Sequence, residues 1–382
     1  MTEQRYAVAA AAIFDGALAR DNCAVIVQDG HIVSLGRRRD VPSGIPLHEL
    51  PDGAWLAPGF IDVQVNGGGD VLFNNEPTPN GVAAIAAAHR RFGTTGLLPT
   101  LITDSDDKMR AARAAVDAAM ATQPGVLGIH FEGPFLSPEK TGVHDPSLMR
   151  APNSMHRDLF ASPSGATLVT LAPECVPDGF IRSLVGDGVR VSLGHSMATY
   201  EQTRAAIADG LTGFTHLFNA MRSMSAREPG PIAAALESPG CWYGLIVDGA
   251  HVAPAMLRLA LKGAGTPMLV TDAMPSVGGV KKSFALQGRE IMTDGERCVT
   301  KDGVLAGSGI DMATAVRNCV KLLGVPLVDA LGFASRAPAE FLGLGNRFGR
   351  IAPGYRADMV VLDPQEVRVL GTYLAGIYEA ST

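Results

Sequence analysis

Four residues with side chains suited to hydrolytic chemistry each lie near or just beyond the end of a short apolar run in the middle of the chain. They are Glu132, His195, His216 and Asp272. One carboxylate and two imidazoles form a ligand set suited to a catalytic divalent cation, and three protein ligands leave a coordination position open. Such a cation lowers the pKa of water and polarises a carbonyl group. The sequence therefore predicts a metal-dependent hydrolase with Glu132, His195 and His216 as metal ligands.

Asp272 is interpreted as the general acid/base of this hydrolysis. It follows the last of the apolar runs, where it could take a proton from water and return it to a leaving nitrogen. The alternative is that Asp272 is only the N-cap of a helix that begins at Ala273. Pro275 and the pair Gly278-Gly279 argue against a helix at that point.

The elements that must position these residues are eight apolar runs separated by alanine-rich, helix-like segments. The runs lack strict alternation, as expected for parallel strands covered on both faces. They are Phe60–Val65, Gly96–Thr100, Val126–Phe131, Thr167–Leu171, Val189–Leu193, Gly213–Leu217, Tyr243–Val247 and Pro267–Thr271. The helix-like segments include Gly81–Phe92, Asp106–Ala121, Thr199–Asp209 and Pro254–Lys262. Strand–helix alternation in eight units predicts an α/β fold, a closed (β/α)8 TIM-like barrel.

Polar residues stand at the ends of most of these runs. Catalytic groups in β/α barrels lie at the C-terminal strand ends. A His or Asp after a single strand is often only a helix cap or a satisfied core group. Six polar strand ends on one rim favour an active site instead. The run Gly67-Gly68-Gly69 is interpreted as a tight turn at this rim, since no helix-like segment follows it.

The two ends of the chain have a different sequence pattern, in which short β-type runs alternate with turn residues. These runs are Tyr6–Phe14, Ala24–Gln28, His31–Leu35, Asp358–Leu362 and Val367–Leu370. They predict a small β-sandwich domain built from both termini, residues 1–57 and 351–382, around a barrel at 58–350. The alternative is a pair of unrelated tails.

Composition limits the partners and the compartment. The chain has 382 residues, a net charge of −6 and only one short basic cluster, Arg37-Arg38-Arg39, so nucleic acid is not an expected partner. Its five cysteines are scattered without a CxxC spacing, which indicates neither a disulfide framework nor a thiolate zinc site. Ala7–Phe14 is interpreted as a first strand rather than a signal peptide. We expect a cytoplasmic protein without a membrane partner.

Several further groups suit an anionic, hydroxyl-rich substrate. Arg227 offers a forked donor for a phosphate, and His144 and His251 could donate to a carbonyl, hydroxyl or phosphate. Asn219 and the backbone at Ala220 could contact ring oxygens. The segment Gly307-Ser308-Gly309 precedes a predicted helix at Asp311–Leu323, whose free backbone N–H groups could face an anion.

These motifs resemble the N-acetylglucosamine-6-phosphate deacetylase family of the amidohydrolase superfamily along the whole chain. The matching segments are Pro58–Gly67, His130–Phe135, Gly194–Ser196, His216–Met221, Arg227–Gly230, Asp248–His251 and Val270–Ala273. The closing segment Arg350–Asp358 resembles a general amidohydrolase signature.

The resemblance implies a role for each matching residue. Glu132, His195 and His216 would hold the metal, Asp272 would be the general acid/base, and His144 would help to polarise the acetyl carbonyl. Substrate contacts would come from Val143, His144, Asn219, Ala220, Arg227, His251 and Ser308. The reaction would be hydrolysis of N-acetyl-D-glucosamine 6-phosphate to D-glucosamine 6-phosphate and acetate. Family members are commonly homodimers, so the resemblance also implies a homodimer.

The sequence departs from most amidohydrolases at the first strand. They carry His-x-His there for a second metal, whereas this chain has Gln64 and Asn66. Amide side chains are poor ligands for zinc-type cations, so we expect one divalent metal ion per subunit. Zn²⁺ is the first choice, with Fe²⁺, Mn²⁺, Co²⁺ and Ni²⁺ as alternatives. The absence of the His-x-His pair also disfavours dihydroorotase-like or hydantoinase-like activity. Such enzymes usually carry a modified lysine at the end of the fourth strand, where this chain has Pro173-Glu174.

Two other functions are alternatives to deacetylation of N-acetyl-D-glucosamine 6-phosphate. The first is deacetylation of the galactosamine isomer, which differs from the glucosamine sugar at one hydroxyl. The second is a non-catalytic scaffold with an amidohydrolase fold that has lost its metal. The intact set of Glu132, His195, His216 and Asp272 argues against the scaffold.

Overall fold

The computed structural model describes residues 5–161 and 164–381. Its contacts divide the chain into two compact units, each described separately below. The first unit comprises the described residues within 1–62, 89–96 and 311–382, and the second comprises those within 63–88 and 97–310. Domain boundaries after residues 57 and 350 remain a prediction.

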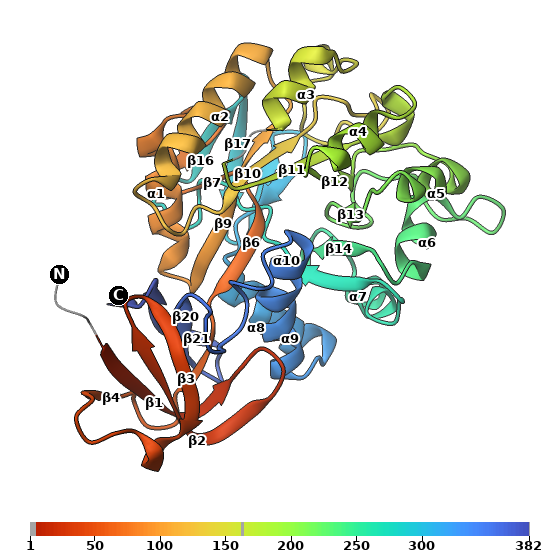
Figure 1. The fold of residues 1–382 in the computed structure, drawn as a ribbon. Coiled ribbons are helices and arrows are strands. Elements are labelled where there is room, and N and C mark those ends of the chain that lie inside the picture. Colours follow the sequence, from red (N-terminus) through yellow and green to blue (C-terminus); the bar gives the residue numbers. More distant parts are fainter. Residues whose placement is uncertain (1–4, 162–163, 382) are drawn as a thin grey trace. The chain divides into compact units, whose positions relative to one another are not determined.

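The predicted barrel strands are confirmed. One sheet of eight parallel strands has the order β15-β14-β13-β12-β11-β10-β9-β6 (Figure 1). The strands are β6 (Phe60–Val65), β9 (Thr94–Ile102), β10 (Gly128–Glu132), β11 (Ala166–Leu171), β12 (Arg190–Leu193), β13 (Gly213–Phe214), β14 (Trp242–Leu245) and β15 (Thr266–Leu269). A parallel bridge between Val65, the last residue of β6, and Ala273, beyond β15, brings the two edges of the sheet together. The barrel is therefore nearly closed.

Helices connect successive strands of this sheet, and α2, α4 and α5 lie on its outer side (Figure 1). The connecting helices are α1 (Pro79–Arg90), α2 (Asp106–Met120), α3 (Ser154–Phe160), α4 (Phe180–Gly186), α5 (Tyr200–Ala208), α6 (Gly230–Glu237) and α7 (Pro254–Ala260). Local sequence explains their starts. The Ser105 side chain accepts from the Lys108 N–H at the start of α2, and Thr199 and Gln202 form a capping box on α5.

Strand β10, which ends at Glu132, is buried along its whole length and requires a glycine at its first residue. A Cβ on Gly128 would lie 1.9 Å from the carbonyl oxygen of Ala166 on the neighbouring strand β11. The strand could accept a side chain there only by moving away from β11.

Gly128→Ala is therefore expected to lower the free energy of unfolding by ~1–3 kcal/mol, the usual cost of overpacking a tight interior. Denaturant unfolding followed by circular dichroism would measure it. Gly186→Ala at the end of α4 is the matched control, because a Cβ at Gly186 meets nothing within 4 Å. Equal midpoints for the two variants would contradict the prediction.

The predicted β-domain from both ends of the chain is confirmed in the first unit. One sheet has the order β22-β21-β20-β5-β1-β2-β3, with β4 paired to β1. Its strands are β1 (Arg5–Phe14), β2 (Ala19–Gln28), β3 (His31–Arg37), β4 (Leu47–Glu49), β5 (Trp55–Pro58), β20 (Met359–Asp363), β21 (Arg368–Leu374) and β22 (Ile377–Ala380). Leu56 on β5 pairs with Val361 on β20, which joins the N-terminal and C-terminal strands. Both residues are buried in one apolar core.

The first unit also contains the helices α8 (Met312–Leu323), α9 (Leu327–Ala334) and α10 (Arg336–Phe341). The helix predicted at Asp311–Leu323 is confirmed as α8, with Asp311 as its N-cap. The Asp311 carboxylate caps the helix by accepting from the Thr314 N–H, which satisfies one of the free N–H groups at this helix end. An anion site at the start of α8 stays a prediction.

The second unit contains an antiparallel sheet that the sequence analysis did not predict. It is formed by β16 (Ser283–Leu286), β17 (Arg289–Asp294), β18 (Arg297–Thr300) and β19 (Leu305–Ser308), which we call the accessory sheet. Gly307 and Ser308 end β19 rather than forming a loop before a helix. The predicted turn after β6 is confirmed as a hairpin of β7 (Gly67–Gly68) and β8 (Val71–Leu72).

Within the described residues, no helix is long and apolar enough to cross a membrane. All five cysteines are free thiols, in agreement with the scattered spacing in the sequence.

Candidate active site

The four residues singled out in the sequence lie at C-terminal strand ends of the barrel and are all buried. Glu132 is the last residue of β10, and His195, His216 and Asp272 follow β12, β13 and β15. The last three have positive φ angles of 49°, 32° and 52°. Non-glycine residues in this region are strained, and such strain concentrates at functional sites. Asp272 precedes an isolated bridge at Ala273 rather than a helix, so the N-cap alternative is wrong.

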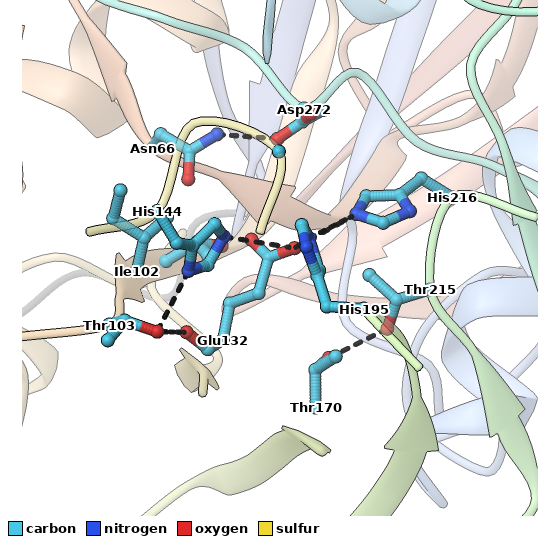
Figure 2. A network of polar contacts seen from close by, with 12 residues as sticks. Asn66, Ile102, Thr103, Glu132, His144, Thr170, His195, Thr215, His216 and Asp272 are labelled. Atoms are coloured by element: carbon cyan, nitrogen blue, oxygen red, sulfur yellow. Dashed lines mark hydrogen bonds and ion pairs between the residues drawn. The ribbon is translucent and has the colours of Figure 1, made fainter. Parts of the chain in front are cut away.

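The ligand atoms of the predicted metal site converge (Figure 2). Glu132 Oε1 lies 3.1 Å from His195 Nε2 and 3.0 Å from His216 Nε2, and the two Nε2 atoms are 3.1 Å apart. Ligands ~2.1 Å from a tetrahedral zinc ion stand about 3.4 Å from one another. The three atoms are therefore spaced almost as a metal would hold them.

Hydrogen bonding supports a cation among these atoms. His195 Nδ1 donates to the carbonyl oxygen of Lys140 at 2.7 Å, which turns Nε2 toward Glu132 and His216. Burial alone would raise the pKa of Glu132, but the close contacts of its carboxylate with His195 and His216 outweigh burial and hold that pKa well below its ordinary value. A charged carboxylate facing imidazole nitrogens at this spacing fits a divalent metal.

A third histidine, His144, is close enough to be considered as a ligand. Glu132, His195 and His144 offer ligand atoms within 4.8 Å of one another. His144 Nε2 is 4.0 Å from Glu132 Oε1, whereas His216 Nε2 is 3.0 Å from the same oxygen. The tighter geometry favours His216 as the third ligand and places His144 beside the metal site.

His144 is completely buried, and its Nδ1 lies 2.8 Å from Thr103 Oγ1. Burial and the nearby His195 lower the pKa of His144 to about 3. The ring is therefore neutral at neutral pH and carries one N–H.

Asp272 is held by the two amide side chains that replace the usual His-x-His pair. Its Oδ1 accepts from Asn66 Nδ2 at 2.6 Å and from Gln64 Nε2 at 3.2 Å. Burial, and then the charge of Glu132, raise the pKa of Asp272 to about 6. This role of Gln64 and Asn66 was not predicted from the sequence, although their position at the end of the first strand indicated the same rim.

A cavity of about 320 Å³ opens onto these groups. Five of the predicted substrate-contact residues line it, namely Val143, His144, Asn219, Ala220 and His251. One wall is apolar and includes Ile102, Met274 and Leu305. His251 Nδ1 bonds Asp248 Oδ2 at 2.6 Å. Burial alone would raise the pKa of Asp248, but the hydrogen bonds from the His251 side chain and from the backbone outweigh burial and lower that pKa.

The structure does not bring the other two predicted contact residues to the cavity lining. Arg227 is exposed and stands apart from the described lining residues. Ser308 is buried, with its hydroxyl donating to the Thr271 carbonyl oxygen, and Gly307 lines the cavity in its place. Their contact with a substrate stays a prediction.

The residue at the end of the fourth barrel strand has a structural function. Glu174 accepts from the Ser196 hydroxyl and the Met197 N–H, and thereby fixes the turn that follows His195.

Known proteins match this chain over nearly its full length. The model of the amidohydrolase family matches residues 55–380. The N-acetylgalactosamine-6-phosphate deacetylase of Shewanella sp. (strain ANA-3) is 42% identical over 94% of this chain and 93% of its own. The N-acetylglucosamine-6-phosphate deacetylase of Haemophilus influenzae is 33% identical over 92% of this chain and 93% of its own.

Solved structures agree with the sequence relatives. The crystal structure of N-acetylglucosamine-6-phosphate deacetylase from Pasteurella multocida has a TM-score of 0.95 and 34% identity, and covers 99% of this chain and 100% of that one. The chain belongs to the amidohydrolase family, as the resemblance of its motifs implied.

Proposed function

We propose that the protein hydrolyses N-acetyl-D-glucosamine 6-phosphate to D-glucosamine 6-phosphate and acetate. The observation that carries this proposal is the convergence of Glu132, His195 and His216 beside Asp272 in one cavity. The relatives that act on N-acetylated amino-sugar phosphates support the choice of substrate.

Glu132, His195 and His216 would hold the divalent cation, with Zn²⁺ as first choice and Fe²⁺, Mn²⁺, Co²⁺ or Ni²⁺ as alternatives. The bound cation would supply Lewis acidity to the amide carbonyl and to water. Asp272 is the proton carrier. Asn66 and Gln64 hold its Oδ1, which leaves Oδ2 to accept a proton from the attacking water and deliver it to the leaving nitrogen.

The remaining lining residues orient the substrate. His144 donates to the acetyl carbonyl oxygen, and Val143, Asn219, Ala220 and His251 contact the sugar. Arg227 and Ser308 complete the contacts to the sugar phosphate. We also infer a cytoplasmic homodimer with one metal per subunit, which light scattering on the purified protein would test.

Turnover should fall as the pH drops through about 6. Asp272 can accept a proton only when ionised, and its pKa is raised to about 6 by burial and Glu132. A bound cation favours the ionised form, so the acidic limb of the profile lies at or below that value. Measurement of kcat as a function of pH tests this predicted fall in turnover. Asn66→Ala removes a hydrogen bond to the carboxylate and should move the limb to higher pH. Identical profiles for both proteins would contradict the assignment.

A specific observation favours a second substrate, since the relative from Shewanella that is 42% identical acts on the galactosamine isomer. Acetate release from both purified sugar phosphates, with metal content measured on the same sample, would decide between them. We expect the higher kcat/KM for the glucosamine sugar. A higher value for its epimer would overturn the assignment of the sugar. No acetate from either would favour the non-catalytic scaffold.

A further inference from the structure

A row of hydroxyl and imidazole side chains lies inside the barrel, below the predicted metal site. Residues two apart on a strand point to the same face, so His130 on β10 points into the barrel interior beneath Glu132. Hydroxyl side chains stand beside it on the neighbouring strands. We call the whole set the polar belt, and all of its members are buried, namely Thr100, His130, Thr170, Ser192 and Thr215.

The members of the polar belt contact one another in a continuous series. On β10, His130 Nδ1 lies 3.2 Å from Thr100 Oγ1 on β9, and His130 Nε2 lies 2.7 Å from Thr170 Oγ1 on β11. Thr215, which follows β13, has its Oγ1 2.7 Å from Thr170 Oγ1 (Figure 2). Ser192 Oγ on β12 also lies 2.7 Å from Thr215 Oγ1. Hydrogen bonds between side chains therefore join the neighbouring strands from β9 to the end of β13.

One predicted ligand, His216, depends on its backbone for its position. A metal-binding histidine normally donates its other ring N–H to a partner that orients the ring. His195 has such a partner in the Lys140 carbonyl oxygen, whereas His216 Nδ1 has no hydrogen-bond partner from another residue in the described part of the chain. His216 also has a φ of 32°, a strained conformation that persists only where neighbours hold it. The ring is therefore aimed by the residues next to it in the chain.

Thr215 directly precedes His216 and is the point at which the polar belt meets the metal site. Its hydroxyl is held by the belt from two sides. A Cβ on Gly194 would lie 2.6 Å from Thr170 Cγ2 and 3.1 Å from Thr215 Cβ, so the two threonines fit only because residue 194 is glycine. The belt is thus packed against the residue before His195 as well.

We propose that the polar belt positions His216 for the metal, with Thr170 as its central positioning residue. Thr170 links Thr215 to His130. Through Thr215 it fixes the backbone of His216, whose Nε2 lies 3.0 Å from Glu132 Oε1. Ligands held in the bound arrangement bind more tightly, because less freedom is lost on binding. The inference rests on the proposed function, which it deepens by assigning residues that hold a ligand without touching the metal.

Thr170→Val tests the proposal, because it keeps the shape of the side chain and removes its hydroxyl. We expect the dissociation constant for Zn²⁺ to rise ~10–100-fold, the usual effect of losing a partner that orients a ligand. Competition with a chromophoric chelator measures this constant on the full-length protein without any turnover. At saturating Zn²⁺, KM for the sugar phosphate should change by less than about twofold, because the described lining of the cavity contains no belt residue.

Thr167→Val is the matched control on the same strand. Thr167 is also buried, but residues three apart on a strand point to opposite faces, and its hydroxyl contacts Arg113 of α2 outside the barrel. This variant should keep the wild-type affinity for Zn²⁺. Thr170→Ser, which retains the hydroxyl, should also bind Zn²⁺ as the wild type does.

Wild-type Zn²⁺ affinity in folded Thr170→Val would overturn the proposal, as would an equal loss of affinity in Thr167→Val. If Thr170→Val does not fold, Ser192→Ala removes the other hydroxyl bonded to Thr215, and an unchanged dissociation constant in that variant would overturn the proposal. A wild type that releases no acetate from either sugar phosphate would overturn the proposed function instead, and the Zn²⁺ constants would still decide the role of Thr170.

Discussion

Asp272→Asn is expected to lose nearly all turnover while keeping its metal and its fold. The substitution preserves shape, and the asparagine oxygen can still accept from Asn66 and Gln64. It cannot accept a proton from water, which is the function proposed for Asp272. Loss of a general acid/base typically costs ~10²–10⁴-fold in rate.

Acetate release, metal content and thermal unfolding on the same preparation would test this prediction. Asp302→Asn is the matched control, because Asp302 is an exposed carboxylate next to Gly303 in the cavity wall. It should keep wild-type turnover. Retained activity in Asp272→Asn would refute the proton-transfer role, and equal losses in both variants would assign the effect to local charge.

Glu132→Gln is expected to lose the metal and, with it, the activity. An amide is a poor ligand for zinc-type cations, and the change removes the negative charge that faces His195 and His216. Metal catalysis of this kind supplies several kcal/mol of transition-state stabilisation, so turnover should fall by about 10³-fold or more.

Elemental analysis beside the acetate assay, before and after addition of excess Zn²⁺, would measure both effects. Glu139→Gln is the control, since Glu139 is an exposed carboxylate in the loop that also carries Lys140. A Glu132→Gln protein with one tightly bound metal and unchanged turnover would remove Glu132 from the ligand set.

Much of the barrel could be predicted because its signal is local. A strand buried on both faces, such as β6 or β10, appears in the sequence as an apolar run. The residue at the end of such a run is then predicted to lie at the C-terminal rim of the barrel. Since parallel strands align their carboxyl ends, the order of residues along the chain was enough to bring Glu132, His195, His216 and Asp272 together.

The accessory sheet was missed for the opposite reason. Its strands are only partly buried, as the pattern of β17 shows, so they lack the apolar runs that mark the barrel strands. Turn signals were nevertheless present, because Gly288, Gly295 and Gly303 all have positive φ angles between its strands. Evenly spaced glycines of this kind indicate hairpins.

The supporting contacts of the site could not be predicted from residue types. Thr103 and His144 are 41 positions apart, and Gln287 is 184 positions from Thr103. A threonine after a strand or a glutamine in a turn has no distinctive pattern by itself. Such contacts depend on pairings between distant segments, which local propensity does not encode.

The pairing of β5 with β20 makes the first unit a late product of synthesis. Strands β1 to β5 leave the ribosome before the barrel, yet Leu56 gains its partner Val361 only after the whole barrel has been translated. Until then β5 has an open edge that can pair with other chains. Nascent chains that stall before Met359 should therefore be prone to aggregation, and in every molecule the sheet can be completed only after β20 has been translated.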